Sequence, residues 1–233
     1  MQVRLYSLME GAAAATGTAI VIDVYRAFTT AAVAFSQGAR KIILVDSPRR
    51  ALELRNREIG ELCMGEVDGI KVPEFDFSNS PHELSQKDLA SKTLIQSTSA
   101  GTRGAAAAAR RTDALYVAAL VNAGATARSV LQVSPAHVSV VAMGTGGIRR
   151  SDEDEQCALY IRNLLLGCRP DPGAVSSLVR SAHDSLKFDD PSRPHFDPRD
   201  RKIALAVDSI DLTIRVRDEG GLLVARPQTG AKG

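Results

Sequence analysis

Short runs of Val, Ile and Leu alternate with stretches of helical length along most of this chain, and this alternation constrains the fold most strongly. Apolar runs of this kind are typical of buried strands, which helices connect across the faces of a sheet. The pattern predicts an α/β fold, a three-layer α/β/α architecture with a mainly parallel or mixed central sheet. The expected strands are 18–24, 41–45, 61–65, 93–96, 114–119 and 137–143. The expected helices are 27–37, 48–59, 101–110, 123–132, 152–166 and 172–187.

Three segments depart from this alternation. Residues 66–92 form a long connection with several turn signals, which inside a compact domain is typical of a functional or lid-like loop. The Pro- and Asp-rich segment FDDPSRPHFDPRD predicts an irregular surface loop. Residues of about 211–227 alternate around Glu-Gly-Gly, which predicts a hairpin at the sheet edge. Since no internal repeat is visible, we expect residues 1–233 to form a single domain.

Composition favours a small molecule as the partner of this chain. The formal net charge is only +2, and aromatic residues make up 4% with no Trp, so neither a basic surface nor stacking rings for nucleic acid are supplied. No apolar run reaches the roughly 18 residues that a membrane helix needs, and the first residues lack a signal-peptide pattern. Three widely spaced Cys give no disulfide framework. We therefore expect a cytoplasmic protein with no nucleic-acid or membrane partner, while a homo-oligomer stays open.

Polar residues gather where the expected strands end, which is where α/β proteins bind ligands. Asp23 ends the first strand, and Arg26, Thr29 and Thr30 follow at the entry to a helix. This Asp is either a metal ligand or nucleophile, or a carboxylate stabilised by the helix dipole. Glu66, in the segment MGEVDG, is either a hard-cation ligand or a turn residue.

Two further strand ends carry hydroxyls and carboxylates. In IQSTSAGTRG, Thr98, Thr102 and Arg103 surround a helix start, which makes either an anion site or an elaborate N-cap. The segment is not a P-loop, because the Gly-Lys-Ser/Thr ending is absent. In SDEDE, Glu153 and Asp154 belong to four acids in one helical turn. Like charges there repel and a divalent cation would relieve the repulsion, although some of the four are open to a solvated interpretation.

Residue spacing argues against several other chemistries. No Cys has the Arg six positions later that a cysteine phosphatase requires, and Tyr25 stands where a haloacid dehalogenase would have its second Asp. The four His show neither HExxH nor HxH pairing, so a zinc site is poorly supported. Carboxylates, hydroxyls and Arg together favour magnesium and a phosphate.

Five segments carry a family resemblance, and in chain order they are VIDVYRAFTTAAVAFSQGA, GEVDGIKVPEFDFSNSP, STSAGTRG, LVNA and GGIRRSDED. Together they resemble the 2-phosphosulfolactate phosphatase family, magnesium-dependent enzymes of the coenzyme M pathway. The resemblance spans about residues 18–160. It implies an α/β/α fold unlike that of other phosphatases, and hydrolysis of a phosphate ester beside a carboxylate and a sulfonate. It implies a site that contains Asp23, Arg26, Thr29, Thr30, Glu66, Asp76, Asn79, Ser80, Thr98, Gly101, Thr102, Asn122, Glu153 and Asp154.

We assign expected roles within this set by side-chain chemistry. The expected Mg²⁺ ligands are Asp23, Glu66, Asp76, Glu153 and Asp154. The expected catalytic residues are Asp23, Arg26, Glu66, Glu153 and Asp154, with Asp23 either attacking phosphorus or activating water. The expected residues that bind substrate or phosphate are Thr29, Thr30, Asn79, Ser80, Thr98, Gly101, Thr102, Arg103 and Asn122.

Two positions depart from the family pattern. Val67 stands where the family usually has Arg, and Ala100 stands where it usually has Asn. Losing an Arg from a site for a multiply charged substrate weakens binding by a few kcal/mol unless another cation replaces it. We expect a magnesium-dependent phosphatase that acts on 2-phosphosulfolactate or a close analogue. The alternative is a non-catalytic module that binds an anion or metabolite on the same fold.

Overall fold

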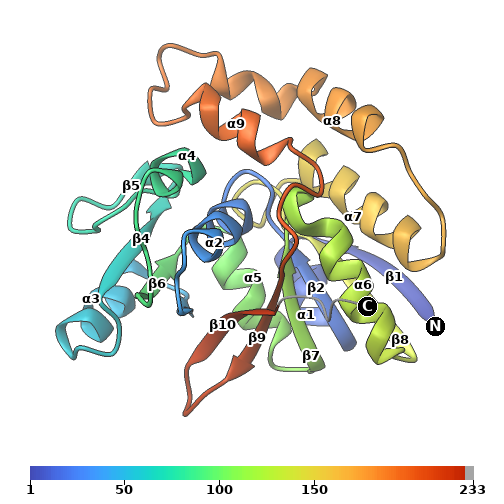
Figure 1. The fold of residues 1–233 in the computed structure, drawn as a ribbon, viewed down its shortest axis with the longest axis horizontal. Helices are drawn as coiled ribbons and strands as arrows, with labels where there is room; N and C mark the ends of the chain where they lie inside the picture. The colour runs from blue at the N-terminus through green and yellow to red at the C-terminus, as the bar shows by residue number, and fades with distance from the viewer. Residues whose placement is uncertain (229–233) are drawn as a thin grey trace.

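Over residues 1–228, which the computed structural model describes, ten strands form one mixed sheet that helices flank (Figure 1). The last five residues of the predicted domain, 229–233, lie outside the described residues. The strands are β1 (Gln2–Ser7), β2 (Gly17–Ile22), β3 (Lys41–Val45), β4 (Leu62–Val67), β5 (Ile70–Lys71), β6 (Thr93–Ser97), β7 (Thr112–Ala118), β8 (His137–Ala142), β9 (Thr213–Asp218) and β10 (Leu223–Gln228).

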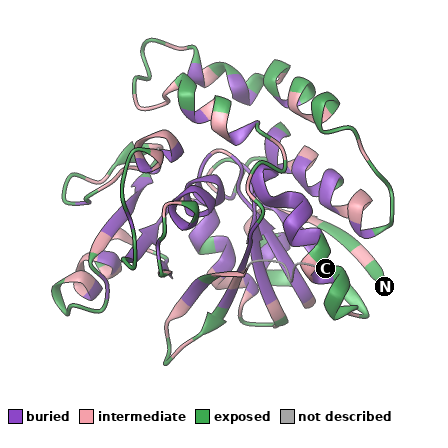
Figure 2. Ribbon diagram, in the orientation of Figure 1, coloured by how far each residue is buried: buried purple, intermediate pink, exposed green. Residues whose placement is uncertain are grey.

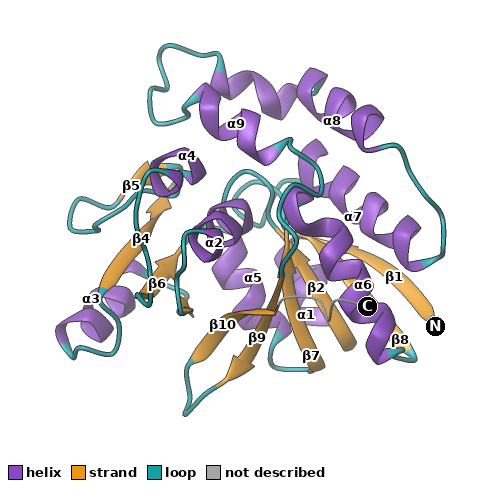
Figure 3. Cartoon of the chain, viewed as in Figure 1, coloured by secondary structure: helices purple, strands orange, loops and turns teal. Residues whose placement is uncertain are grey.

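The helices alternate with these strands through most of the chain. They are α1 (Leu8–Ala14), α2 (Ala27–Ser36), α3 (Pro48–Asn56), α4 (Pro81–Ser85), α5 (Gly101–Ala108), α6 (Ala123–Val133), α7 (Asp152–Leu165), α8 (Pro172–Ser181) and α9 (Pro198–Ala204), with the 3-10 helices η1 (Leu120–Asn122) and η2 (His183–Phe188). Helix α1 packs against α5, and α6 packs against α7 (Figure 3). The predicted fold class is confirmed.

The sheet consists of two largely parallel halves that an antiparallel hairpin joins, and the short edge strand β5 is antiparallel to β4. Its strand order is β1-β8-β2-β7-β9-β10-β3-β6-β4-β5. Strand β9 pairs with β7 in one half, and β10 pairs with β3 in the other. The prediction that this hairpin lies at the sheet edge is therefore wrong. Alternation identifies a strand, but the burial of Ile214, Val216, Val224 and Ala225 depends on neighbours that are far away in the sequence.

Six elements were absent from the prediction: β1 and α1 at the N-terminus, β5 and α4 inside the expected loop 66–92, η1, and the late helix α9. Strand β1 is an edge strand whose residues are mostly exposed or half-buried, so its hydrophobic pattern is weak. Helix α9 begins inside the segment expected to be an irregular loop. The Asp197 side chain accepts a hydrogen bond from the Arg199 amide, and Pro198 occupies the first turn, a combination that favours a helix start. The predicted helix 172–187 is divided into α8 and η2.

The segment from η2 to α9, residues 183–204, lies across the end of the sheet where β2 and β8 finish, and we call it the cap (Figure 1). The central strands are almost wholly buried, whereas α8 and much of the cap are exposed (Figure 2). No helix within residues 1–228 has both the length and the apolar character needed to span a membrane. The cap and the strand ends enclose the candidate site.

Candidate active site

A cavity of about 840 Å³ lies between the cap and the loops that follow the parallel strands. Its floor comes from the ends of β2, β4 and β8, where ligands bind in open α/β sheets. Of the site residues expected from the sequence, the structure brings six to this cavity. They are Asp23, Arg26, Glu66, Asn79, Glu153 and Asp154.

Asp23 lies directly after β2, at the start of α2, and is only 6% exposed. Its Oδ1 accepts a hydrogen bond of 3.0 Å from the Ala27 amide. Burial raises the pKa of Asp23 to about 6; the Ala27 amide opposes the rise and the charge of Glu66 adds to it. A Cβ on Gly101 would lie 2.8 Å from the Asp23 Oδ2, so the start of α5 approaches this carboxylate more closely than a side chain would allow. Gly101 therefore shapes the site without lining the cavity.

Asp154 joins the ends of two parallel strands. Its Oδ1 accepts from the Val24 amide at 2.7 Å, and its Oδ2 accepts from the Gly144 amide at 2.8 Å. Burial, together with the charges of Asp23 and Glu153, raises the pKa of this carboxyl well above its usual range. Asp154 therefore holds together the loop after β2, which begins with Asp23, and the loop after β8.

Glu153 is the carboxylate with an open buried oxygen. It lies in the first turn of α7 and is 3% exposed, and its Oε2 has no hydrogen-bond partner among residues 1–228. Burial raises the pKa of Glu153 to about 7, which the positive charge of Lys187 partly opposes. The nearby Ser151 hydroxyl is also buried without a partner and lowers the pKa of Glu153, so either this hydroxyl or a bound cation would pair the oxygen.

Glu66 holds two loops together. Its Oε1 accepts from the Ser99 amide at 2.7 Å, and its Oε2 accepts from the Gly69 amide at 2.6 Å and the Ser99 hydroxyl at 3.0 Å. This network fixes the β4–β5 turn against the loop before α5. The buried Asn79 Oδ1, by contrast, has no partner among the described residues and lines the same cavity.

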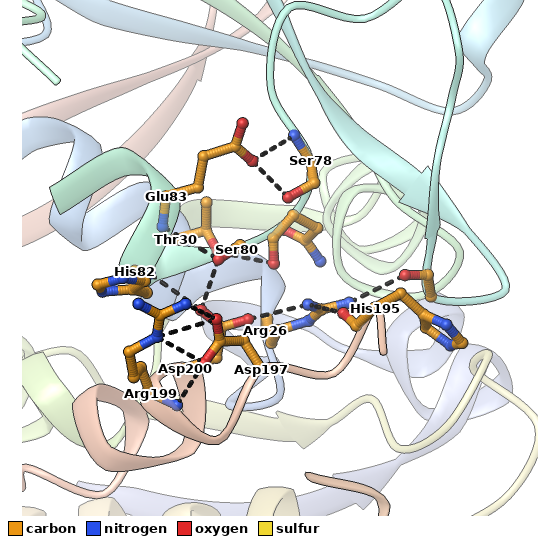
Figure 4. Close-up of polar contacts among 12 residues, drawn as sticks. Arg26, Thr30, Ser78, Ser80, His82, Glu83, His195, Asp197, Arg199 and Asp200 are labelled. Carbon is orange, nitrogen blue, oxygen red and sulfur yellow. Dashed lines mark hydrogen bonds and ion pairs between the residues drawn. The ribbon is translucent and has the colours of Figure 1, made fainter. Parts of the chain in front are cut away.

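Arg26 lines the cavity and also holds the cap through several of its donors (Figure 4). Its Nη1 donates to Asp200 Oδ2 at 2.9 Å and to the His195 carbonyl at 2.8 Å, and its Nη2 donates to the Gly69 carbonyl at 3.0 Å. Asp200 is fully buried and its Oδ1 also accepts from the Ser80 hydroxyl at 2.6 Å. We call this arrangement of Arg26, Asp200 and Ser80 the cap junction.

The threonines at the two helix starts are buried and bonded to the backbone or to one another. Thr29 Oγ1 donates to the Val24 carbonyl at 2.8 Å, and Thr30 Oγ1 donates to the Asn79 carbonyl at 3.3 Å. Thr98 and Thr102 cap each other, because each backbone amide donates to the other hydroxyl. None of the four is among the residues that line the cavity, and their hydrogen bonds hold the loops that do line it.

Three further expected binding residues also lie outside the cavity lining, namely Ser80, Asn122 and Arg103. Asn122 is fully buried at the start of α6, where its Oδ1 accepts from the Ala119 amide at 2.9 Å. Arg103 is exposed, and its only hydrogen bond among residues 1–228 is a long one of 3.5 Å to the Ser99 carbonyl. The expectation that Arg103 binds substrate rested on its place at a helix start, but its side chain does not reach the cavity lining.

Asp76, expected as a metal ligand, lies away from the cavity. Its Oδ2 accepts from the Cys63 amide at 2.7 Å and from Arg55 Nη1 at 3.1 Å. Cys63 precedes Glu66 by three positions on β4, which separates them by roughly 10 Å in an extended strand. In the sequence Asp76 lies between the cavity residues Glu66 and Asn79. The chain folds back, however, so that Asp76 contacts the start of β4, away from the cavity.

This placement gives a prediction for Asp76→Asn. The variant retains an acceptor for the Cys63 amide and loses only a partly exposed ion pair with Arg55. We expect kcat/KM to stay within about 3-fold of wild type and stability to fall by about 1 kcal/mol or less. Urea unfolding and phosphate-release kinetics measure the two quantities. A tenfold loss of turnover in a folded variant would return Asp76 to the site.

The cavity residues fit a magnesium ion in donor chemistry. Magnesium takes oxygen ligands and commonly uses one or two carboxylates together with substrate and water oxygens. Asp23 and Glu153 supply the carboxylates, and the unpartnered Oε2 of Glu153 is an acceptor that a cation would satisfy. Within residues 1–228, no three His, Cys, Asp or Glu side chains form a complete metal-binding group. The five-carboxylate set expected from the sequence is therefore not assembled as one cluster.

The cap and the loop before α7 build the opposite wall of the cavity, which was not predicted from the sequence. That wall contributes Arg149, Lys187, Arg193, His195 and Phe196. Burial lowers the pKa of His195, and the nearby Arg26 lowers it further. Arg149 lies in the quoted segment GGIRRSDED, but no motif marks the other four residues. The only signal was the length of the Pro- and Asp-rich segment that carries three of them.

The chain is similar to known proteins over most of its length. Residues 5–189 match the family described as 2-phosphosulpholactate phosphatase. A protein of Bacillus subtilis is 32% identical over 204 residues, which cover 86% of this chain and 87% of that protein. A protein of Deinococcus radiodurans is 40% identical over 148 residues, or 64% and 61% of the two chains, and one of Thermus thermophilus is 33% identical over 167 residues, or 70% of each. Each is named as a probable 2-phosphosulfolactate phosphatase.

Proposed function

Because this chain belongs to the 2-phosphosulpholactate phosphatase family, we propose that it hydrolyses the phosphate ester of 2-phosphosulfolactate, or of a close analogue, with the help of magnesium. The family makes it a phosphoric monoester hydrolase. The observation that carries the magnesium dependence is the buried, unpartnered Oε2 of Glu153, which lies in the cavity with Asp23. We also propose that the protein is cytoplasmic and that its partner is a small phosphorylated acid.

The residues of the cavity divide the work of such a reaction. Asp23 and Glu153 would hold the magnesium ion, which when bound neutralises charge on the phosphoryl oxygens. Asp23 either attacks phosphorus or takes the proton of a water that attacks it, and in both cases the ester P–O bond breaks and the hydroxy acid leaves. If Asp23 attacks, water then hydrolyses the aspartyl phosphate and releases phosphate. Asp154 keeps the loops after β2 and β8 at a fixed separation through the Val24 and Gly144 amides. Positioning and charge neutralisation carry most of phosphoryl-transfer catalysis, and this arrangement supplies both.

The alternative function is a module that binds the same anions without chemistry. Ala100 lines the cavity where the family usually has Asn, which favours a change in binding. The grouping of Asp23, Glu66, Glu153 and Asp154 around the cavity favours an enzyme, because burying several carboxylates is costly and a binding module for anions gains nothing from it.

Phosphate release from a small panel tests the proposed function. The panel contains 2-phosphosulfolactate, phospholactate and 3-phosphoglycerate, each with magnesium and then with excess chelator. We expect turnover with magnesium and a fall to about 1% or less with chelator, reversed by added magnesium. Turnover that chelator leaves unchanged contradicts the magnesium dependence. No turnover on any member, with thermal stabilisation by the same compounds, supports the binding module.

A further inference from the structure

Lys187 is an enclosed cation that the proposed reaction has not used. Its side chain is 14% exposed, and its Nζ lies 5.1 Å from the ring centroid of Tyr25, 5.6 Å from that of Phe188 and 5.3 Å from that of Phe196. The nearest carboxylate oxygen paired with it, Glu153 Oε1, is 4.0 Å away. That distance is too long for a hydrogen bond, and within residues 1–228 the ammonium donates none.

The other cations of the cavity are already committed. Arg149 donates to a buried carboxylate, Asp184, at 2.6 Å. Arg26 belongs to the cap junction. Arg193 is about half exposed and pairs with a neighbouring Asp at 3.4 Å. Lys187 is thus the one cation of the cavity lining, within the described residues, that is both enclosed and without a hydrogen-bonded acceptor.

The negative charge of the proposed substrate calls for such a cation. A substrate with a phosphate and two acid groups needs positive charge in a partly enclosed site. The three rings attract the ammonium of Lys187 through their faces and hold it at the cavity wall, while leaving its N–H donors to a ligand.

We propose that Lys187 binds an anionic oxygen of the ligand. The inference rests on the proposed function for the identity of the substrate, but it concerns anion binding and can be tested without turnover. The oxygen belongs either to the phosphoryl group or to the carboxylate–sulfonate end of the ligand. Both groups offer Lys187 an anionic oxygen, and they are told apart by which simple anion, phosphate or sulfoacetate, binds at the site.

Titration calorimetry of the full chain with magnesium separates these sources, with inorganic phosphate as one probe and sulfoacetate as the other. The variants are Lys187→Met and Lys187→Arg. Lys202→Met, which removes an exposed cap lysine outside the cavity lining, is the matched control. We expect Lys187→Met to raise the Kd of at least one probe about 10- to 100-fold, the range for a lost charged hydrogen bond. Lys187→Arg should stay within about 5-fold, and the control should not change.

Each result has a defined meaning. A loss confined to phosphate assigns Lys187 to the phosphoryl group, and a loss confined to sulfoacetate assigns it to the acid end; both support the inference. Unchanged Kd values in Lys187→Met overturn it, even if the melting temperature falls, and so does a wild-type chain that binds neither probe. Lysine-dependent binding in a chain that releases no phosphate would instead refute the proposed function and leave the inference standing.

Discussion

Asp23→Asn is expected to lower kcat/KM for 2-phosphosulfolactate by about 10³-fold, or roughly 4 kcal/mol of transition-state stabilisation. The amide retains an oxygen for the Ala27 amide, so the start of α2 should keep its place. What the variant loses is the negative charge, which the proposed reaction needs for the magnesium ion and for attack or proton removal. Initial rates of phosphate release at saturating magnesium measure the effect.

The same variant should be at least as stable as wild type when magnesium is absent. Burial raises the pKa of Asp23 from 3.8 to about 6, so the folded chain binds this proton more tightly than the unfolded chain does. The ionised carboxylate then lowers the free energy of unfolding progressively as the pH rises from about 4 to about 6. Asp23→Asn should therefore melt at a higher temperature than wild type at pH 7.5 with chelator, and the difference should vanish near pH 4.

Asp152→Asn is the matched control for both measurements. Asp152 lies in the same acidic turn as Glu153, but its side chain is exposed and lies outside the cavity lining. We expect it to retain kcat/KM within about 2-fold and to show no pH-dependent gain in stability. If Asp23→Asn keeps more than a tenth of wild-type activity, Asp23 is not the attacking or activating group.

Local patterns in the sequence were enough to identify the carboxylates of the cavity floor. Asp23 ends a strand, and Glu153 and Asp154 open a helix, so the rule that ligands bind at the carboxyl ends of strands placed them together. The strand β3 was predicted with the bounds that the structure has. These successes share one cause, because each depends on residues that are close in the chain.

Features that depend on distant partners were not predictable in the same way. Arg26 matched the motif, but its role is set by Asp200, which lies 174 residues away. The enclosure of Lys187 depends on Tyr25 from the loop after β2. The place of the β9–β10 hairpin depends on β3 and β7, which both lie far before it in the sequence. A single sequence contains these residues but not their contacts.

The cap junction should contribute more to stability than any surface ion pair of the chain. Asp200→Ala removes the acceptor of Arg26 Nη1, of the Ser80 hydroxyl and of the His82 amide, and it leaves a guanidinium that is 3% exposed without its counter-charge. Breaking a buried ion pair on one side costs about 3–5 kcal/mol. Urea unfolding followed by circular dichroism measures this loss. Glu219→Ala, which removes a partly exposed pair with Arg226, should cost about 1 kcal/mol or less.

A double-mutant cycle separates the ion pair from the other bonds of the junction. Arg26→Met combined with Asp200→Leu removes both charges, so no unpaired charge stays buried, and the double variant should be at least about 2 kcal/mol more stable than the sum of the single changes predicts. Additive effects would contradict the junction, since they would mean that the two side chains act independently. Asp200→Asn retains an acceptor for the Ser80 hydroxyl and provides a milder variant if Asp200→Ala does not fold.

The bonds of the cap junction also hold the cap over the cavity. We therefore expect the variants that lose the most stability to bind phosphate most weakly.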